Sequence, residues 1–168
     1  MFRAPIGNSG QALVFTELVL KHLHTYRQTK PGDLEAGGQL FAKISLNQVY
    51  VCEVTGPRSG DKRGRYSYRP DRKAEQMEIR ERHSRDVHFI GDWHTHPEPV
   101  PSPSHTDSAS MVDCFRKSKH SLNAFLLVIV GNAEFPQSLN LTLYDHSGMV
   151  AALDLWPFPE LENEFVSP

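Results

Sequence analysis

The sequence predicts an α/β protein, and three observations carry this prediction. Three segments place apolar residues at helical spacing, while several others alternate apolar and polar residues or form short continuous apolar runs, as strands do. No internal repeat interrupts this order of elements. The length of 168 residues, with 39% hydrophobic and 10% aromatic residues, suits one core. We therefore expect a single domain over residues 1–168.

The N-terminal part predicts one helix followed by strands. Residues 10–27 carry an apolar set at helical spacing, and Pro31-Gly32-Asp33 ends this helix. The predicted strands 41–45 and 48–54 flank a hairpin-like link, and residues 64–68 predict another short strand. The apolar set of the helix consists of Leu13, Val14, Leu18, Val19 and Leu23.

Residues 58–85 are rich in both basic and acidic side chains. Within them, residues 71–85 predict an amphipathic helix with Glu78 four residues ahead of Arg82 as a favourable pair. Mixed charge indicates a solvated face, and a surface that docks an acidic protein is the alternative. The expected apolar contacts of the helix are Ala74, Met77 and Ile79, and the candidate partner contacts are Arg63, Arg65 and Arg69.

The C-terminal half alternates strands with one helix. Residues 88–93 predict a buried strand, residues 104–118 a helix, and the apolar run 124–130 a central strand covered on both faces. Residues 139–144 and 149–155 predict a hairpin at or near a sheet edge. The tail, about residues 156–168, is rich in proline and acids and is either loosely attached or covers an edge, with Trp156, Phe158 and Phe165 able to dock.

A metal site is predicted where the strand 88–93 ends. His94 and His96 are two apart, so on an extended chain their imidazoles point to the same side. The proline-rich spacer 97–103 is stiff, and Ser104 and Asp107 follow it at the start of the predicted helix. Two His and one Asp make three ligands, the number with which catalytic zinc sites keep a fourth position open.

Hydrolysis at such a site also requires a group that carries the proton of the attacking water to the leaving amine. Glu35 is the candidate, because it lies just before a predicted strand in Leu34-Glu35-Ala36-Gly37-Gly38, where two glycines allow close backbone approach. It precedes His94 by 59 residues.

Together these motifs resemble the MPN+/JAMM metalloproteases, in particular the prokaryotic, deubiquitinase-like JAB type. The likeness rests on Glu35-x-Gly-Gly-x-Leu-Phe, on Gly91-Asp-Trp-His-Thr-His-Pro and on Ser104-x-x-Asp107, and it covers most of the chain. It implies a curved mixed β-sheet flanked by helices. It also implies that Glu35 is the general acid/base, that His94, His96 and Asp107 hold a catalytic Zn2+, and that Ser104 positions water and stabilises the oxyanion.

Each part of this pattern has a plainer explanation when taken alone. Glu35 is then a surface carboxylate, and Ser104 with Asp107 a helix N-cap with a first-turn acid, a role that can coexist with ligation. The joint pattern favours the metal site. His105 is expected on the surface, and the histidines at 22, 24, 83, 88, 120 and 146 are expected outside the site.

The resemblance implies a zinc-dependent isopeptidase that removes a ubiquitin-like or C-terminally conjugated protein from its target. Similar prokaryotic proteins lie in CBASS and related antiphage operons beside ubiquitin-activating-like and ubiquitin-conjugating-like partners, and the substrate tail is expected to add as a strand along residues 64–68. The alternatives are a processing protease for small peptides or sulfur-carrier tails, a non-catalytic MPN scaffold, and a phosphoesterase, which needs more His and Asp ligands.

Charge and composition limit the partners and the cellular location expected for the protein. The formal net charge of −2 argues against nucleic acid as a partner. No secretory leader is recognised, and no apolar run approaches the roughly 18 residues that span a bilayer, so we expect a cytoplasmic protein without membrane contact. Cys52 and Cys114 form no spaced motif and are expected to be free, buried thiols.

Overall fold

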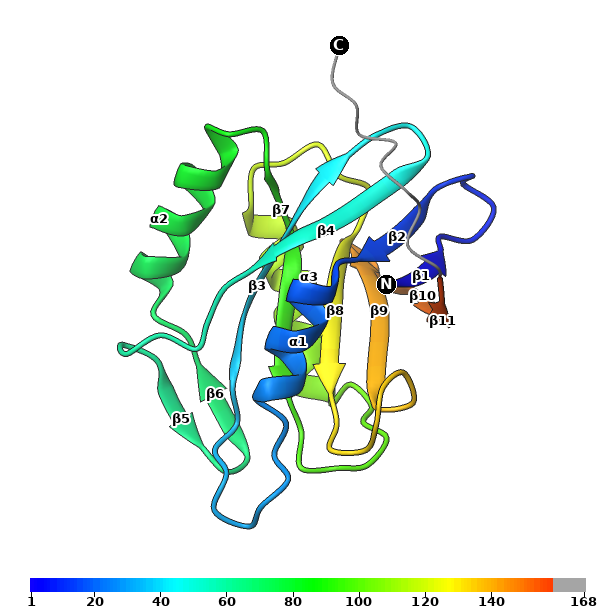
Figure 1. Cartoon of the computed structure of the whole chain (residues 1–168). Helices are drawn as coiled ribbons and strands as arrows, with labels where there is room; N and C mark the ends of the chain where they lie inside the picture. Colours follow the sequence, from blue (N-terminus) through cyan, green and yellow to red (C-terminus); the bar gives the residue numbers. More distant parts are fainter. Residues whose placement is uncertain (159–168) are drawn as a thin grey trace.

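In a computed structural model, which describes residues 1–158, a nine-stranded mixed sheet is flanked by helices (Figure 1). Its strand order is β10-β9-β8-β7-β3-β4-β2-β1-β11, and β5 and β6 form a separate hairpin. The elements are β1 (Phe2–Pro5), β2 (Ala12–Phe15), α1 (Glu17–Thr25), β3 (Gly37–Ile44), β4 (Gln48–Val54), β5 (Lys62–Gly64), β6 (Ser67–Arg69), α2 (Arg72–His83), β7 (His88–Thr95), α3 (His105–Lys117), β8 (Phe125–Val130), β9 (Leu139–Asp145), β10 (Gly148–Leu153) and β11 (Trp156–Pro157).

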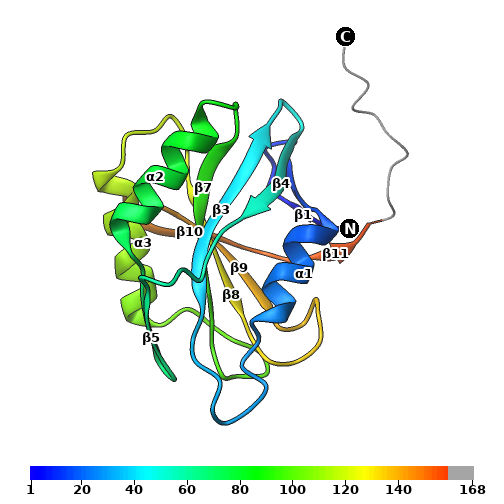
Figure 2. The same ribbon diagram turned by 60° about the vertical axis from the view of Figure 1, so that its left-hand side comes forward.

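The helices cover both faces of the sheet, which confirms the predicted α/β class. Figure 2 shows α2 and α3 on one side of the sheet and α1 on the other. On β8 the side chains alternate: Leu126 and Val128 join the core beneath α1, whereas Leu127 and Ile129 join the core beneath α3. Every residue of β8 is buried, so the prediction of a central strand covered on both faces is confirmed.

The sheet is curled, and its two edge strands follow one another in sequence. Only Asp154 and Leu155 separate β10 from β11, yet the two strands lie at opposite ends of the strand order. The pairing of β11 with β1 means that the start of the C-terminal tail covers a sheet edge. Phe158 also lies against the domain, 5.3 Å from the Arg3 guanidinium. Phe165 lies outside the described residues.

The predicted helix 10–27 is wrong at its N-terminal end. Residues Ala12–Phe15 form β2, whose four side chains are all buried, and the helix starts only at Glu17. The Thr16 side chain accepts a hydrogen bond from the Val19 amide and thereby caps the helix. The reason is non-local: β2 pairs in parallel with β4, a partner more than 30 residues further along the chain. Leu18, expected in the core, is 78% exposed.

The hairpins are largely as predicted. The β3–β4 and β9–β10 pairs are antiparallel, and β10 is an edge strand. The strand predicted at 64–68 is wrong in one respect, because residues 65 and 66 form a turn between the ends of β5 and β6. The strand expected at 88–93 is longer and runs to Thr95, so it includes His94.

Helix α2 is confirmed, with Asp71 as its N-cap, but its contacts differ from those expected. Met77 is 62% exposed, whereas Glu75 is buried. The largely buried side chain of Arg58 explains this, since its Nη1 lies 3.8 Å from a Glu75 carboxylate oxygen and its Nε donates to Glu78 at 2.8 Å. Glu78 is therefore paired with Arg58 rather than with Arg82.

Arg82 instead donates to Glu53 at 2.9 Å, so the expected pair within α2 is replaced by pairs to the sheet. The charged segment 58–85 is thus only partly solvated, and part of it holds α2 in place. Cys52 and Cys114 are free, as expected, but each is only half-buried. None of the helices within residues 1–158 is long and apolar enough to cross a membrane.

A methyl group at Gly91 should destabilise the fold strongly. Gly91 has φ +149° beside a bulge in β7, and an added Cβ would lie 1.8 Å from the carbonyl oxygen of Leu126 on β8. We expect Gly91→Ala to lower the free energy of unfolding by about 2 to 4 kcal/mol. Gly148→Ala is the matched control, because Gly148 has φ +134° with no atom within 4 Å. Equal losses in urea denaturation would contradict steric contact with β8 as the cause.

Candidate metal and catalytic site

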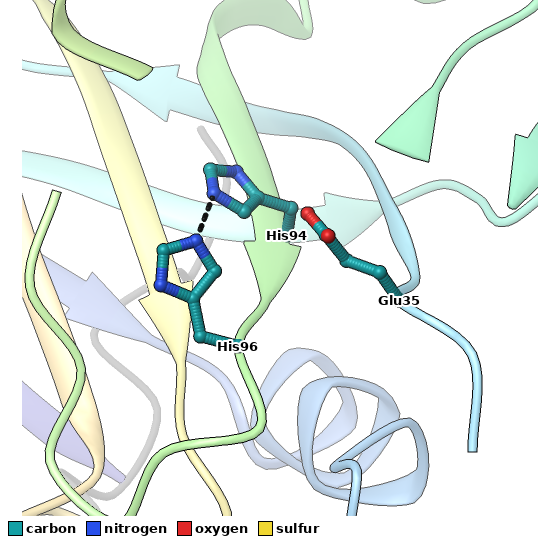
Figure 3. A group of neighbouring side chains, drawn as sticks. All are labelled: Glu35, His94 and His96. Carbon is teal, nitrogen blue, oxygen red and sulfur yellow. Dashed lines mark hydrogen bonds between the residues drawn. The ribbon is translucent and has the colours of Figure 1, made fainter. Parts of the chain in front are cut away.

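The two histidines of the predicted site come from the end of β7 and just beyond it. His94 is the second-to-last residue of β7 and His96 follows the strand, with the buried Thr95 between them. Their Nε2 atoms are 3.1 Å apart (Figure 3). The spacing of two therefore places both imidazoles on one side, as the sequence predicts.

Asp107 reaches the same point from the first turn of α3. Its Oδ1 lies 3.2 Å from His94 Nε2, and its Oδ2 lies 3.5 Å from His96 Nε2. Its carboxylate also accepts a hydrogen bond from the Ser104 amide at 2.8 Å, while the Ser104 hydroxyl accepts one from the Asp107 amide at 3.1 Å. This reciprocal capping box holds the carboxylate against the histidines, so the cap and the cluster coexist.

These donor groups lie close enough together to share one metal ion. Two atoms that are each about 2.0 to 2.2 Å from one tetrahedral ion lie about 3.3 to 3.6 Å from one another. His94 Nε2 lies 3.1 Å from His96 Nε2, and the Asp107 carboxylate lies 3.2 Å from His94 through Oδ1 and 3.5 Å from His96 through its other oxygen, Oδ2. Two imidazoles and one carboxylate are also a donor set that zinc accepts.

Glu35 completes the group from the irregular segment that precedes β3. It is only 7% exposed, and one of its carboxylate oxygens and the ring nitrogens of His94 and His96 all lie within 4.8 Å of one another. Figure 3 shows the carboxyl group of Glu35 pointing toward His94. A separation of 59 residues in sequence is thus reduced to a few ångströms.

Burial and neighbouring charges shift the pKa values of the two carboxyl groups, Glu35 and Asp107, in opposite directions. Burial raises the pKa of Glu35 above its ordinary value, although His94 and His96 pull it down. Burial also acts to raise the pKa of Asp107, but hydrogen bonds from both histidines outweigh it and lower that pKa. The Asp107 carboxylate in turn raises the pKa of His96. Of these two carboxyl groups, Glu35 is therefore the one that binds a proton more readily.

The main chain of Glu35 is held by the β5–β6 hairpin, a contact that the sequence analysis missed. The Glu35 amide donates to the Gly64 carbonyl at 2.8 Å, and Arg63 Nε donates to the Glu35 carbonyl at 2.8 Å. Arg63, expected as a contact for a partner, therefore bonds within the chain. No local pattern signals a bond between residues 28 apart.

The two glycines after Glu35 behave as the sequence predicts. A Cβ at Gly38 would lie 1.9 Å from the Thr55 carbonyl oxygen, so only glycine permits this approach of β3 to the chain after β4. That same carbonyl accepts a hydrogen bond from the indole of Trp93, which is buried beside His94.

A cavity of about 150 Å³ adjoins the cluster and is lined by residues that include Glu35, His94, Asp107, Tyr68 and Asp92. Asp92 is not among the site residues predicted from the sequence, although it lies two residues before His94 and so shares its side of β7. Burial raises the pKa of Asp92 to about 7. A groove of about 770 Å³ between α2 and α3 adjoins this cavity, and Arg72 and Ser110 line both.

Three of the other histidines form hydrogen bonds away from the cluster, and His105 does not face it. His105 is exposed at the start of α3, as expected. His22 Nε2 lies 2.7 Å from the Gly56 carbonyl, His88 pairs with Asp86, and His120 lies 3.0 Å from the Phe115 carbonyl. The prediction that these three lie outside the cluster is confirmed by these contacts.

Comparisons with known proteins found one matching family model and several similar proteins. The family model described as prokaryotic homologs of the JAB domain matches residues 17–142. A protein of Vibrio cholerae named CD-NTase/cGAS isopeptidase is 35% identical over 122 residues, which cover 70% of this chain and 74% of the relative. A protein of Escherichia coli with the same name is 30% identical over 103 residues, covering 60% of this chain and 65% of the relative.

The fold also has a solved counterpart. The solution structure of a protein from Desulfitobacterium hafniense superimposes with a TM-score of 0.57 at 19% identity, covering 82% of this chain and 88% of that one. At this identity the likeness concerns the fold alone.

Proposed function

Since this chain belongs to the family of prokaryotic homologs of the JAB domain, we propose that it is a zinc-dependent isopeptidase that releases a C-terminally conjugated protein from its target. The observation that carries the proposal is the convergence of His94, His96 and Asp107, with donor atoms 3.1 to 3.5 Å apart, beside the buried Glu35. One domain, residues 1–168, contains the whole site in this proposal.

His94 and His96 are the nitrogen ligands for zinc and Asp107 is the oxygen ligand. When bound, zinc supplies Lewis acidity, which makes water acidic enough to ionise near neutral pH. The capping box at Ser104 keeps the Asp107 carboxylate turned toward the histidines. These ligands must lose their protons to bind a metal, so affinity should fall in acid.

Glu35 is the group that moves the proton. Its raised pKa suits a base that takes a proton from the attacking water and then gives it to the amine of the departing lysine. Ser104 is exposed, and its hydroxyl oxygen accepts a hydrogen bond from the Asp107 amide. In this proposal the Ser104 hydroxyl donates its hydrogen to the developing oxyanion. In this scheme Glu35 and Ser104 touch the reacting atoms.

The substrate follows from the relatives, whose names designate isopeptidases of CD-NTase/cGAS proteins. We propose a conjugate in which the C-terminus of such a protein, or of a ubiquitin-like protein, is joined to a lysine. Ubiquitin-activating-like and ubiquitin-conjugating-like enzymes of an antiphage operon then make the bond that this enzyme cuts. The C-terminal tail of the conjugated protein would add as a strand to β6. Within the described residues β6 pairs only with β5, and its Tyr68 lines the cavity.

A synthetic pair of substrates tests this proposal. The zinc-loaded protein is incubated with a CD-NTase joined through its C-terminus to the ε-amine of a lysine peptide, and with the same peptide fused through its α-amine. We expect release of both partners from the first conjugate. Cleavage of only the linear fusion would indicate a processing protease, and cleavage of neither would indicate a scaffold; either result contradicts an isopeptidase.

A further inference from the structure

Glu35 precedes strand β3, so the strand pairing of the sheet does not fix its position. Strand β3 begins at Gly37, and the first pair of the β3–β7 ladder is Gly37 with His94. Glu35 and Ala36 therefore precede the ladder, and their position relative to the two histidines depends on other hydrogen bonds. Side chains of neighbouring segments supply some of these bonds.

Thr95 holds the chain directly after Glu35. It lies between His94 and His96, and its side chain is fully buried. The Thr95 amide donates to the Ala36 carbonyl at 2.8 Å, and the Thr95 hydroxyl oxygen accepts from the Ala36 amide at 3.0 Å. Both main-chain polar groups of Ala36 are thus bound to the residue between the two histidines.

Gln28 fixes that hydroxyl and joins it to two further segments. Its side chain is 3% exposed, and its Oε1 accepts a hydrogen bond from the Thr95 hydroxyl at 2.9 Å. Its Nε2 donates to the Asp33 carbonyl at 3.2 Å and to the Arg65 carbonyl at 2.9 Å. Gln28 therefore ties the start of the Glu35 segment and the β5–β6 turn to β7, and both amide hydrogens are used.

We propose that Thr95 and Gln28 are positioning residues that set the distance between the Glu35 carboxylate and the His94–His96 pair. This inference rests on the proposed function of Glu35. A buried series of hydrogen bonds runs from the Ala36 amide through the Thr95 hydroxyl to the Gln28 side-chain amide. Removing one of these groups leaves a neighbouring group without its hydrogen-bond partner. A displacement of about 1 Å at a catalytic group can cost about 10²-fold in rate, so the expected effect is on turnover.

The test replaces Thr95 by valine, which keeps the shape and removes the hydroxyl, with Thr95→Ser as the conservative control. For Thr95→Val we expect kcat on the lysine-linked conjugate to fall about 10- to 100-fold, with KM and zinc content within twofold of the parent. Thr95→Ser should recover at least half of the parent kcat. A parent-like kcat in Thr95→Val, or a loss of zinc that parallels the loss of kcat, would overturn the inference.

Amide hydrogen exchange supplies a readout that needs neither substrate nor activity. The Ala36 amide should exchange at least about tenfold faster in Thr95→Val than in Thr95→Ser, because only serine restores its acceptor. Equal exchange overturns the inference, whereas absence of cleavage by the parent protein overturns the proposed function alone. If Thr95→Val does not fold, Gln28→Met removes the other end of the same chain, and it must lower kcat without loss of zinc or the inference fails.

Discussion

Glu35→Gln should retain zinc and lose about 10²- to 10⁴-fold of turnover, the contribution typical of a positioned acid/base group. Glutamine keeps the size of the side chain, which is 7% exposed, but it cannot take a proton from water and pass it to an amine. The measurement is kcat on the lysine-linked conjugate, together with zinc content by atomic emission.

Glu17→Gln is the matched control, since Glu17 is an exposed carboxylate in the first turn of α1. It should change kcat by less than about twofold, as surface substitutions usually do. Parent-like turnover in Glu35→Gln would remove Glu35 from the mechanism. A loss of turnover accompanied by a loss of zinc would make Glu35 a ligand instead.

Asp107→Asn should weaken zinc binding by more than about 100-fold. Even the mutation of residues that only hydrogen-bond to a metal ligand typically lowers metal affinity by about 10- to 100-fold. Asparagine retains an oxygen that can accept from the Ser104 amide, so the start of α3 should persist. Zinc affinity is measured by competition with a chelator, and helix content by circular dichroism. Asp113→Asn, on the same helix and half exposed in its pair with Lys117, should leave zinc affinity unchanged.

The metal-free protein should show a pH dependence with a defined sign. The Asp107 pKa is lowered on folding, so its stabilisation is present above its ordinary value of 3.8 and is lost as pH falls through the lowered value. The His96 pKa is raised, so its stabilisation is full below 6.5 and is lost as pH rises through the raised value. Asp107→Asn should therefore destabilise the metal-free protein more at pH 5 than at pH 9, and the reverse order in denaturant unfolding would contradict the ion pair.

Much of the local structure could be predicted because it depends on short-range periodicity. The apolar run 124–130 is the buried strand β8, and Asp71 and Ser104 cap α2 and α3. The prediction failed where a distant partner decides the outcome. Residues 12–15 suit a helix by spacing, yet they form β2 because β4 offers a parallel partner.

The candidate site likewise has a part that local sequence predicts and a part that depends on distant contacts. Alternation along a strand places His94 and His96 side by side, and the capping box places Ser104 next to Asp107, so these two halves follow from the sequence by itself. Their meeting does not, because it requires α3 to pack against the sheet with Asp107 3.2 Å from His94.

The surroundings of Glu35 depend entirely on tertiary structure. The motif identifies Glu35 as the acid/base candidate, but only the fold brings in Gln28 from the chain after α1 and Arg63 from the β5–β6 hairpin. Likewise, the composition of residues 58–85 predicts a charged surface, whereas the Arg58 side chain is only 10% exposed and lies against Glu75 and Glu78. The sequence determines which residues can act and the local spacing between them, since short-range geometry depends only on neighbours. The tertiary structure alone decides which distant groups are buried together, because burial and hydrogen bonding are properties of segments in contact.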